Sequence, residues 1–420
     1  MTPSRADTRW NLGRGRAAPR KRDFALFSLW AGVVGFGGGL SVLAMLRTTA
    51  VERKGWVTER EFDNTATVAQ MLPGGAAANA LALLGLRFYG TEGAVGAYAA
   101  FIFPGFAAIL VLAGFYARLS AVPGVGAFLG GLNAAVVGIV VAITLQMIRS
   151  SIGRVWQMGV AGVGLALSLA GGSSPGEVAV MGVGAGLVLD LAYKRARLAR
   201  TRKVARHASP PVGLPNEGEP LRKRESQEVH SHPLVPIAAG FVAIAGAGTL
   251  VPLALLFLRT GLGAYGGGFA IVPHLQATLV ATGSLAEQQF ADAVAIGKMT
   301  PGPVLLLATF IGYLKAGFPG AIVSTIAIFA GPLVLTIVLG RWLARYRSRR
   351  SVRAALRGLT PAVVGTMAAA GITLGTALHG TGEVAIAGAV AMTLARFEVS
   401  PVLMIFAGGA VSLALSLLHL

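Results

Sequence analysis

The chain has 420 residues, of which 54% are hydrophobic and only 13% are charged, and its formal net charge is +19. A water-soluble domain of this composition would expose large apolar patches and aggregate, so the composition excludes a soluble enzyme or binding domain. Basic residues gather in short loops, which indicates the cytoplasmic side of a membrane protein and no nucleic-acid partner. Because the chain has no cysteine, disulfides and thiolate metal sites are excluded, and we expect neither a metal nor a cofactor.

Apolar segments of roughly 18 to 25 residues follow one another along the chain, each long enough to cross a hydrocarbon core of about 30 Å as a helix. The sequence therefore predicts an all-α polytopic integral membrane protein, since the period-2 alternation of an outer-membrane barrel is absent. Residues 1–22 form a basic tail that runs into the first apolar segment without an obvious cleavage site. We expect this tail to be retained in the cytoplasm.

The first apolar segment, Phe24 to Leu46, is interrupted by the glycines Gly37, Gly38 and Gly39. The tail before it and the basic stretch Arg47 to Arg60 after it are both predicted to be cytoplasmic, so the segment has to enter and leave the membrane by the same side. Each limb has about 11 residues and is roughly 16 Å long, about half of the hydrocarbon thickness. The sequence thus predicts a re-entrant hairpin that turns near the midplane.

The next apolar segment, Phe62 to Leu86, is broken at Pro73 to Gly75 and has the same character. Both hairpins have counterparts in the second half, so we expect about four re-entrant hairpins and about nine full crossings. If every hairpin is instead a full span, the chain crosses about thirteen times, which conflicts with the charge rule at Arg47 to Arg60.

Two halves of the chain match one another at a slowly drifting offset. "GFGGG" at Gly35 to Gly39 matches "AYGGG" 229 residues later, and "EFDNTATVAQMLPGG" at Glu61 to Gly75 matches "QFADAVAIGKMTPGP" at an offset of 228. "GLNAAVVG" at Gly131 to Gly138 matches "GLTPAVVG" at 227. Three ordered matches indicate an internal duplication, which is common in transporters. The predicted organisation is the tail at 1–22, repeats at 23–192 and 252–420, a basic cytoplasmic linker at 193–233 and a connecting transmembrane helix at 234–251.

Loop charges predict that the two repeats have opposite orientations. The stretch Arg341 to Arg357 carries seven arginines and no acid, whereas its first-half equivalent, Gly114 to Gly130, carries only Arg118. The excess of basic residues is in the first half at Arg47 to Arg60, because the equivalent stretch between Leu275 and Gln288 has no basic residue. By the positive-inside rule the repeats are inverted, with the N-terminus and the linker in the cytoplasm.

Helix breaks at matched positions of inverted halves are the best sequence indicator of a transporter's binding site, because irregular backbone at membrane depth persists only inside protein or along a polar cavity. After each break a helix restarts with free N–H groups and about +0.5 charge. Four starts, after Gly39, Gly75, Gly268 and Pro303, would present about +2 and suit a tetrahedral dianion. Pro303 fits the first helical position, where a missing N–H costs nothing. The predicted substrate-binding residues are Gly37, Gly38, Gly39, Gln70, Pro73, Gly74, Gly266, Gly267, Gly268, Lys298, Pro301, Gly302 and Pro303.

Lys298, its first-half counterpart Gln70, Asp292 and His274 are the polar candidates near these breaks. A bound anion or Asp292 offsets the cost of burying the Lys298 charge; alternatively, Lys298 extends to the membrane surface. Gln70 is either a donor to an oxyanion or a partner in an interhelical hydrogen bond. Asp292 and His274 are either a proton relay or satisfied polar residues at helix ends. Close helix packing is the alternative for the glycines, and Arg87 is expected to be a cytoplasmic anchor.

At these motifs the chain resembles the chromate transporter family, the long members in which two related halves are fused. "YGGGFAIVPHLQ" at Tyr265 to Gln276 and "TPGPVLLLATFIGY" at Thr300 to Tyr313 look like the family's FGGG and PGP segments, and "VERKGWVTEREF" and "QMLPG" are similar to its first-half stretch. The resemblance covers about residues 24–418. It implies a bacterial inner-membrane antiporter or potential-driven carrier that exports chromate, confers chromate resistance and accepts sulfate as a structural mimic.

The chain departs from the family at Gly39, where FGGP is usual, at Gly75 and Ala76, where PGPE is usual, and at Lys298, where glutamine is usual. The missing carboxylate weakens the expectation of proton coupling, and the added cation favours tighter anion binding. A sulfate or other oxyanion transporter working by uptake or exchange, and a passive anion channel, stay open as alternatives. We expect no enzyme, because the apolar segments show no nucleophile with a nearby base. The lipid bilayer is the other expected partner, and a homo-oligomer is left open.

Overall fold

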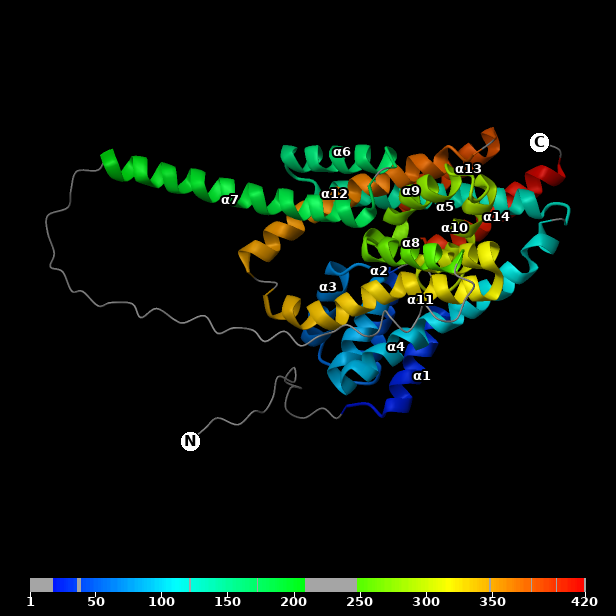
Figure 1. Cartoon of the computed structure of the whole chain (residues 1–420), viewed down its shortest axis with the longest axis horizontal. Helices are drawn as coiled ribbons and strands as arrows, with labels where there is room; N and C mark the ends of the chain where they lie inside the picture. Colours follow the sequence, from blue (N-terminus) through cyan, green and yellow to red (C-terminus); the bar gives the residue numbers. More distant parts are fainter. Residues whose placement is uncertain are drawn as a thin grey trace.

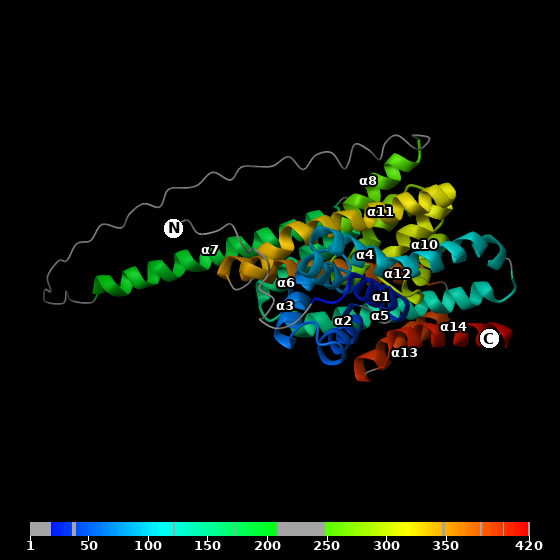
Figure 2. The same cartoon turned by 90° about the horizontal axis from the view of Figure 1, so that it is seen from below.

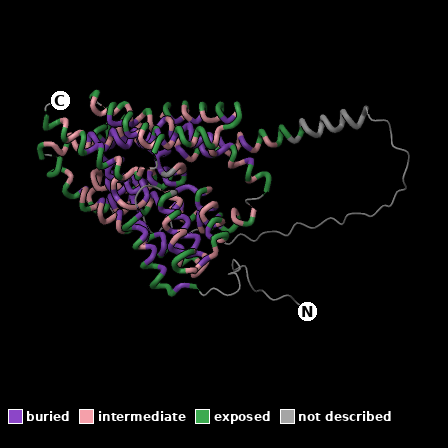
Figure 3. Tube along the Cα trace, turned by 180° about the vertical axis from the view of Figure 1, so that it is seen from behind, coloured by how far each residue is buried: buried purple, intermediate pink, exposed green. Residues whose placement is uncertain are grey.

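The computed structural model describes residues 18–35, 39–120, 122–171, 173–207, 248–346, 349–378, 380–397 and 399–418. Within these ranges all regular structure is helical, as the apolar segments predict (Figure 1). Buried residues gather in the middle of the molecule, and the outer surfaces of the helices carry many exposed positions (Figure 3). Exposed residues on the surface of one long helix include Phe103, Val111 and Phe115, which is the arrangement that lipid contact requires.

The described elements form two series in the same order. The first series is α1 (Lys21–Val34), α2 (Gly39–Arg47), the π-helix η1 (Thr48–Arg53), α3 (Glu59–Met71), α4 (Ala76–Leu119), α5 (Val125–Ser151), α6 (Val155–Leu169) and α7 (Pro175–His207). The second series is α8 (Leu250–Leu262), the 3₁₀-helix η3 (Gly266–Ile271), α9 (Val272–Leu275), the π-helix η4 (Gln276–Val280), α10 (Glu287–Met299), the 3₁₀-helix η5 (Val304–Leu306), α11 (Leu307–Tyr346), α12 (Arg350–Gly375), α13 (Thr381–Arg396) and α14 (Pro401–Leu417).

Five described helical stretches are long and apolar enough to cross a membrane, judged by length and composition. They are Ala76–Leu119, Val125–Ser151, Pro175–Tyr193, Val304–Tyr346 and Arg350–Gly375. Shorter apolar helices, among them α6, α8 and α14, accompany them. The chain is therefore a multi-pass membrane protein, and the expected number of crossings, about nine, stays a prediction.

Two of the long helices contain a sharp reversal at a glycine. Gly90 in α4 and Gly317 in α11, which are 227 residues apart, have nearly the same backbone angles, φ 71° and ψ −151° against φ 62° and ψ −150°. A Cβ on Gly85 would lie 2.2 Å from the carbonyl oxygen of Gly93, although these residues would be about 12 Å apart along a straight helix. The chain therefore folds back at each glycine, so α4 and α11 each consist of a short limb followed by a long one.

The long limbs of α4 and α11 pack against each other in opposite directions. The rings of Tyr98 and Phe329 have centroids 6.0 Å apart. Asn79 and Leu83 of the short limb of α4 lie against Thr336 and Gly340 of the long limb of α11, so this short limb runs parallel to the long limb of α11. Because α4 folds back at Gly90, its long limb is antiparallel to that of α11.

The last two helices of each series pack against the other series. Helices α6 and α7 cover α12, and α13 and α14 cover α5 (Figure 1, Figure 2). Glycines allow these helices to approach closely: a Cβ on Gly358 would lie 2.0 Å from the carbonyl oxygen of Gly182, and one on Gly131 would lie 2.3 Å from that of Gly408. Because the exchange is reciprocal, the two series interlock as a two-fold pair does.

The stretch predicted to be a linker begins as a helix. Helix α7 continues to His207, well past residue 193, and then the described residues end. The stretch Tyr193 to His207 contains no glycine or proline and is rich in arginine, alanine and lysine, which favour helix. The rest of the linker lies outside the described residues, as does the predicted connecting helix at 234–251 up to residue 247.

Candidate functional site

Four helix breaks, two from each series, lie together in the structure. The backbone N–H of Gly74, in the α3–α4 break, donates a hydrogen bond of 2.8 Å to the carbonyl of Ala264, in the α8–η3 break. The N–H of Gly302, in the α10–η5 break, donates one of 3.2 Å to the carbonyl of Gly35, in the α1–α2 break. Gly74 and Gly302 are equivalent, as are Gly35 and Ala264, so each series makes the same contact with the other.

The helix starts after these breaks are in van der Waals contact. A Cβ on Gly39 would lie 3.4 Å from that of Ala76, and a Cβ on Gly268 would lie 3.4 Å from that of Val304. Across the two series, a Cβ on Gly75 would lie 3.2 Å from that of Pro303. The structure thus brings Gly39, Gly74, Gly75, Gly268, Gly302 and Pro303 into one cluster, which we call the break cluster.

Positive φ angles explain part of the glycine pattern. Gly74, Gly268 and Gly302 have φ of 100°, 94° and 103°, a region where other residues are strained. Gly266 also has positive φ and abuts Val363 and Met367 of α12.

Two expectations about helix starts are wrong in detail. Pro303 precedes the first helical position instead of occupying it, since its φ of −72° and ψ of 142° are extended. The triplet from Gly266 to Gly268 lies within η3 rather than before a helix, and η5 separates Pro303 from α11, so both second-series restarts begin as 3₁₀ turns. Gly37 and Gly38 lie outside the described residues.

Asn79 supports the α3–α4 break, and sequence analysis missed it. Its fully buried side-chain amide donates to the carbonyls of Ala69, Leu72 and Pro73, at 3.2, 3.4 and 2.9 Å, and its oxygen accepts from the hydroxyl of Thr336 at 3.2 Å. These bonds satisfy the carbonyls that a broken helix leaves unpaired. A lone asparagine in the apolar run that follows Gly75 was the available signal. On the other side of the cluster the Pro301 carbonyl packs against Gly105, where a Cβ would lie only 2.2 Å away.

The counterparts Lys298 and Gln70 have different environments. Lys298 is 7% exposed, and its ammonium lies 5.2 Å from the centroid of the Phe269 ring. Among the described residues no carboxylate lies within ion-pair distance of this ammonium, so neither a pair with Asp292 nor an extension to the membrane surface is observed. Gln70 is exposed and donates to the Ala66 carbonyl of its own helix at 3.2 Å, not to another helix.

Asp292 is the centre of a buried polar network that joins the two series. Its carboxylate accepts hydrogen bonds from the Tyr116 hydroxyl at 2.6 Å, the Asn133 amide at 3.2 Å and the Gln288 amide at 3.0 Å. Asp292 is 1% exposed, so these three donors replace water around a carboxylate. His274, in α9, has a buried Nδ1 without a hydrogen-bond partner in the described part of the chain.

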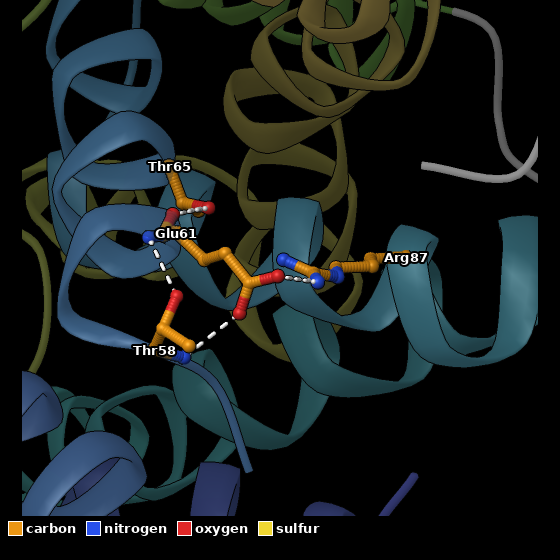
Figure 4. A network of polar contacts seen from close by, with 4 residues as sticks. All are labelled: Thr58, Glu61, Thr65 and Arg87. Atoms are coloured by element: carbon orange, nitrogen blue, oxygen red, sulfur yellow. Dashed lines mark hydrogen bonds and ion pairs between the residues drawn. The ribbon is translucent and has the colours of Figure 1, made fainter. Parts of the chain in front are cut away.

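The outer ends of the α3–α4 hairpin are held together by an ion pair. Arg87, near the end of the short limb of α4, pairs with Glu61 in the first turn of α3 (Figure 4). Glu61 also forms a capping box with Thr58, in which the Thr58 N–H donates to the carboxylate at 2.8 Å. Burial alone would raise the pKa of Glu61, but the hydrogen bonds from Thr58 and Arg87 outweigh it and hold the pKa below its usual value. The Arg87 side chain is thus a nearly buried partner of Glu61, and its place on the cytoplasmic side stays a prediction.

These features define a multi-pass membrane protein with two matched series of broken helices around a shared centre, which is the architecture of a transporter. The chain belongs to the chromate transporter family, whose model, described as "Chromate transporter", matches residues 22–189 and 251–413. It is therefore a member of a transporter family and not an enzyme, and the two matched regions coincide with the two series.

Relatives support the same assignment. The chain is 31% identical over 356 residues to a probable chromate transport protein of Synechococcus elongatus, covering 84% of each chain. It is 28% identical over 357 residues to the chromate transport protein of Cupriavidus metallidurans, covering 84% of this chain and 82% of the relative. The chromate transport protein of Pseudomonas aeruginosa is 26% identical over 371 residues, which is 84% of this chain and 80% of the relative. No solved structure matches the chain.

Proposed function

We propose that the chain exports chromate, or a similar tetrahedral oxyanion, across a bacterial inner membrane and that the anion binds at the break cluster. The observation that carries this proposal is the reciprocal pair of hydrogen bonds, Gly74 to Ala264 and Gly302 to Gly35, which gathers helix starts from both series. Each start offers N–H groups that have no partner in their own helix, and together they favour an anion. The names of the relatives in Cupriavidus and Pseudomonas support chromate as the cargo.

The hairpins of this proposal are re-entrant, and two kinds of observation favour that arrangement. Helix α3 has 13 residues and is about 20 Å long, as is the short limb of α4, so neither limb reaches across a core of about 30 Å. The outer ends of each hairpin also meet. Glu61 pairs with Arg87 in the first series, and Lys315 donates to the carbonyl of Ser284 at 2.6 Å in the second.

The packing of α4 against α11 supports the proposed inversion of the repeats. These helices are equivalent, antiparallel and in contact, so the two-fold axis that relates them is perpendicular to their length. If both cross the membrane, the axis lies in the membrane plane and the repeats have opposite orientations. In this orientation the basic start of α12 faces the cytoplasm, as do the N-terminus and the linker.

Lys298, Asp292 and His274 supply the charge and proton chemistry of the proposed cycle. Lys298 adds a buried cation next to the break after Met299. Asp292 is the candidate proton carrier, with His274 as a second one, for export driven by the proton motive force or the membrane potential. Uptake or exchange of sulfate and a passive anion pathway are the competing functions.

Uptake of labelled chromate into everted membrane vesicles tests this proposal. We expect accumulation that a protonophore abolishes and that excess sulfate reduces. Accumulation unaffected by the protonophore would favour a channel or exchanger. If vesicles containing correctly inserted protein take up no chromate, the cargo or the direction is wrong.

A further inference from the structure

A second polar site lies away from the break cluster, between the α5–α6 junction and the start of α12. It is a cavity of about 330 Å³. Its lining residues are Ser151, Gln157, Arg353, Leu356, Arg357 and Thr360. Every lining residue except Leu356 has a polar or cationic side chain, and both arginines, in the first turns of α12, are exposed.

Two guanidinium groups dominate this cavity. Arg353 and Arg357 are four residues apart on α12 and therefore lie on the same face of the helix. Within the described ranges, no carboxylate is within ion-pair distance of either group, whereas the neighbouring Arg350 pairs with Asp190 at 3.0 Å. The cavity thus presents two uncompensated positive charges to a ligand.

Gln157 is oriented so that it adds a donor. Its side-chain oxygen accepts hydrogen bonds from the backbone N–H groups of Gly153 and Arg154, at 3.0 and 3.1 Å. These bonds fix the amide at the start of α6 and leave its NH₂ group to donate. Two guanidinium groups, an amide NH₂ and the hydroxyl of Ser151 together form a set of donors suited to the oxygens of a tetrahedral anion.

The equivalent place in the other series has the opposite charge. At the offsets of 227 and 226 that relate the series there, Gly126, Gly130 and Glu383 stand where Arg353, Arg357 and Gln157 do. The equivalence extends to the geometry, because a Cβ on Gly130 would lie 2.5 Å from the carboxylate of Glu383. One end of the molecule therefore carries arginines at this place and the other carries a carboxylate.

We propose that the arginine cavity binds a tetrahedral oxyanion, which is either a free dianion such as sulfate or chromate or the phosphate of an anionic lipid. Basic pockets between transmembrane helices bind lipid phosphates by the same contacts. Helix α12 links this cavity to Gly266, two residues before Gly268 of the break cluster. Thr360 is about 10 Å along α12 from Met367, which touches Gly266. If the ligand is a free anion, the cavity would hold the transported anion before it reaches the break cluster, and this version of the proposal rests on the proposed function. If the ligand is a lipid phosphate, the proposal does not depend on that function.

Binding to the full-length protein in nanodiscs of neutral phosphatidylcholine tests this site. Sulfate affinity is measured by titration calorimetry, and retention of phosphatidylglycerol is measured by native mass spectrometry. We expect the double variant Arg353→Gln/Arg357→Gln to weaken the binding of one of these ligands at least tenfold. The control Arg341→Gln/Arg345→Gln removes two arginines that are exposed, as Arg353 and Arg357 are, but that do not line the cavity, and it should bind as the wild type does.

A second variant keeps the fold and reverses the charge. In Gln157→Glu a carboxylate oxygen can still accept the hydrogen bonds from the N–H groups of Gly153 and Arg154 at the start of α6. The variant also places a negative charge in the cavity, so it should weaken the binding of the same ligand. If these variants lose sulfate binding, the ligand is a free oxyanion. If they lose bound phosphatidylglycerol, the ligand is a lipid phosphate. If folded double-arginine and Gln157→Glu variants bind both ligands as tightly as wild type, the proposal is overturned. Gly75→Leu, which blocks the break cluster, should leave ligand binding in the arginine cavity intact. This variant therefore separates a failure of the proposed transport site from a failure of the proposed cavity site.

Discussion

The two hairpins next to the break cluster have the same backbone and different polar side chains. Helices α3 and α10 correspond end to end at an offset of 228, and Gly74 and Gly302 make equivalent hydrogen bonds. In the first hairpin the position before the break is the exposed Gln70, whereas in the second it is the buried Lys298. One turn and a half earlier, α10 carries the buried Asp292 where α3 carries Asn64. The matched backbone builds a shared centre, whereas the buried charged side chains, Asp292 and Lys298, occur only in the second hairpin.

The largest expected effect comes from filling the shared centre. Gly75 has an ordinary negative φ, so leucine there is not strained, but its side chain would occupy the contact with Pro303. We expect Gly75→Leu to lower chromate uptake at least a hundredfold in everted vesicles. Gly96→Leu is the matched control, because nothing lies within 4 Å of a Cβ at that position. Normal uptake by an inserted Gly75→Leu protein would assign the glycines to helix packing.

Substitution of Asp292 tests whether the second hairpin couples anion transport to proton movement. Asp292→Asn removes the charge and sets an NH₂ group against the donors Tyr116, Asn133 and Gln288. We expect uptake to fall about tenfold to a hundredfold and the remaining flux to lose its sensitivity to a protonophore. Tyr116→Phe, which removes one of the three donors, should have a smaller effect in the same direction. Full protonophore-sensitive uptake by Asp292→Asn would exclude Asp292 from coupling.

The Lys298 and Gln70 pair compares the two hairpins directly. Lys298→Gln makes the hairpins alike, and we expect about tenfold weaker sulfate or chromate binding with transport retained, since one charge-assisted contact is worth about 1.5 to 3 kcal/mol. Gln70→Lys adds a cation at the exposed counterpart and should leave affinity unchanged. Equal affinities in wild type and Lys298→Gln would remove Lys298 from the site.

The smallest effect on transport is expected at the outer end of the first hairpin. Glu61→Gln leaves the nearly buried Arg87 without its partner and should lower the free energy of unfolding by about 3 kcal/mol, whereas Arg87→Met should cost less, because Glu61 keeps its bond from Thr58. Since the pKa of Glu61 is lowered in the folded protein, its stabilisation is present above the usual value near 4.3 and is lost as the pH falls through the lowered pKa. Thermal unfolding in detergent at several pH values measures both effects.

Much of the centre was predictable from local sequence. Adjacent proline and glycine residues disfavour a continuous helix, so the breaks at Pro73 to Gly75 and Pro301 to Pro303 could be placed without tertiary information. Isolated prolines were no such guide, because Pro104 and Pro361 lie inside helices. The offset between the two halves then related each break in the first half to its counterpart in the second. A hairpin brings its two outer ends together, so a contact between the start of α3 and the end of the short limb of α4 could be expected, but the ion pair between Glu61 and Arg87 could not.

Features that depend on packing were not predictable. Gln288 is four residues before Asp292 on α10, a spacing that the sequence shows, but Tyr116 and Asn133 come from α4 and α5, and no spacing in the sequence relates them to Asp292. The exchange of α6 and α7 with α13 and α14 follows from glycine contacts between distant segments. Gln70 and Lys298 have equivalent positions in the sequence but different burial, because burial is decided by the helices around them and not by the repeat.

The most direct test of the central claim is anomalous diffraction at the chromium edge from crystals of this protein soaked in chromate. The break cluster predicts an anomalous peak bounded by Gly39, Ala76, Gly268 and Val304. A peak confined to the cavity at Arg353 and Arg357, with none at the break cluster, would contradict the account of where the transported anion binds.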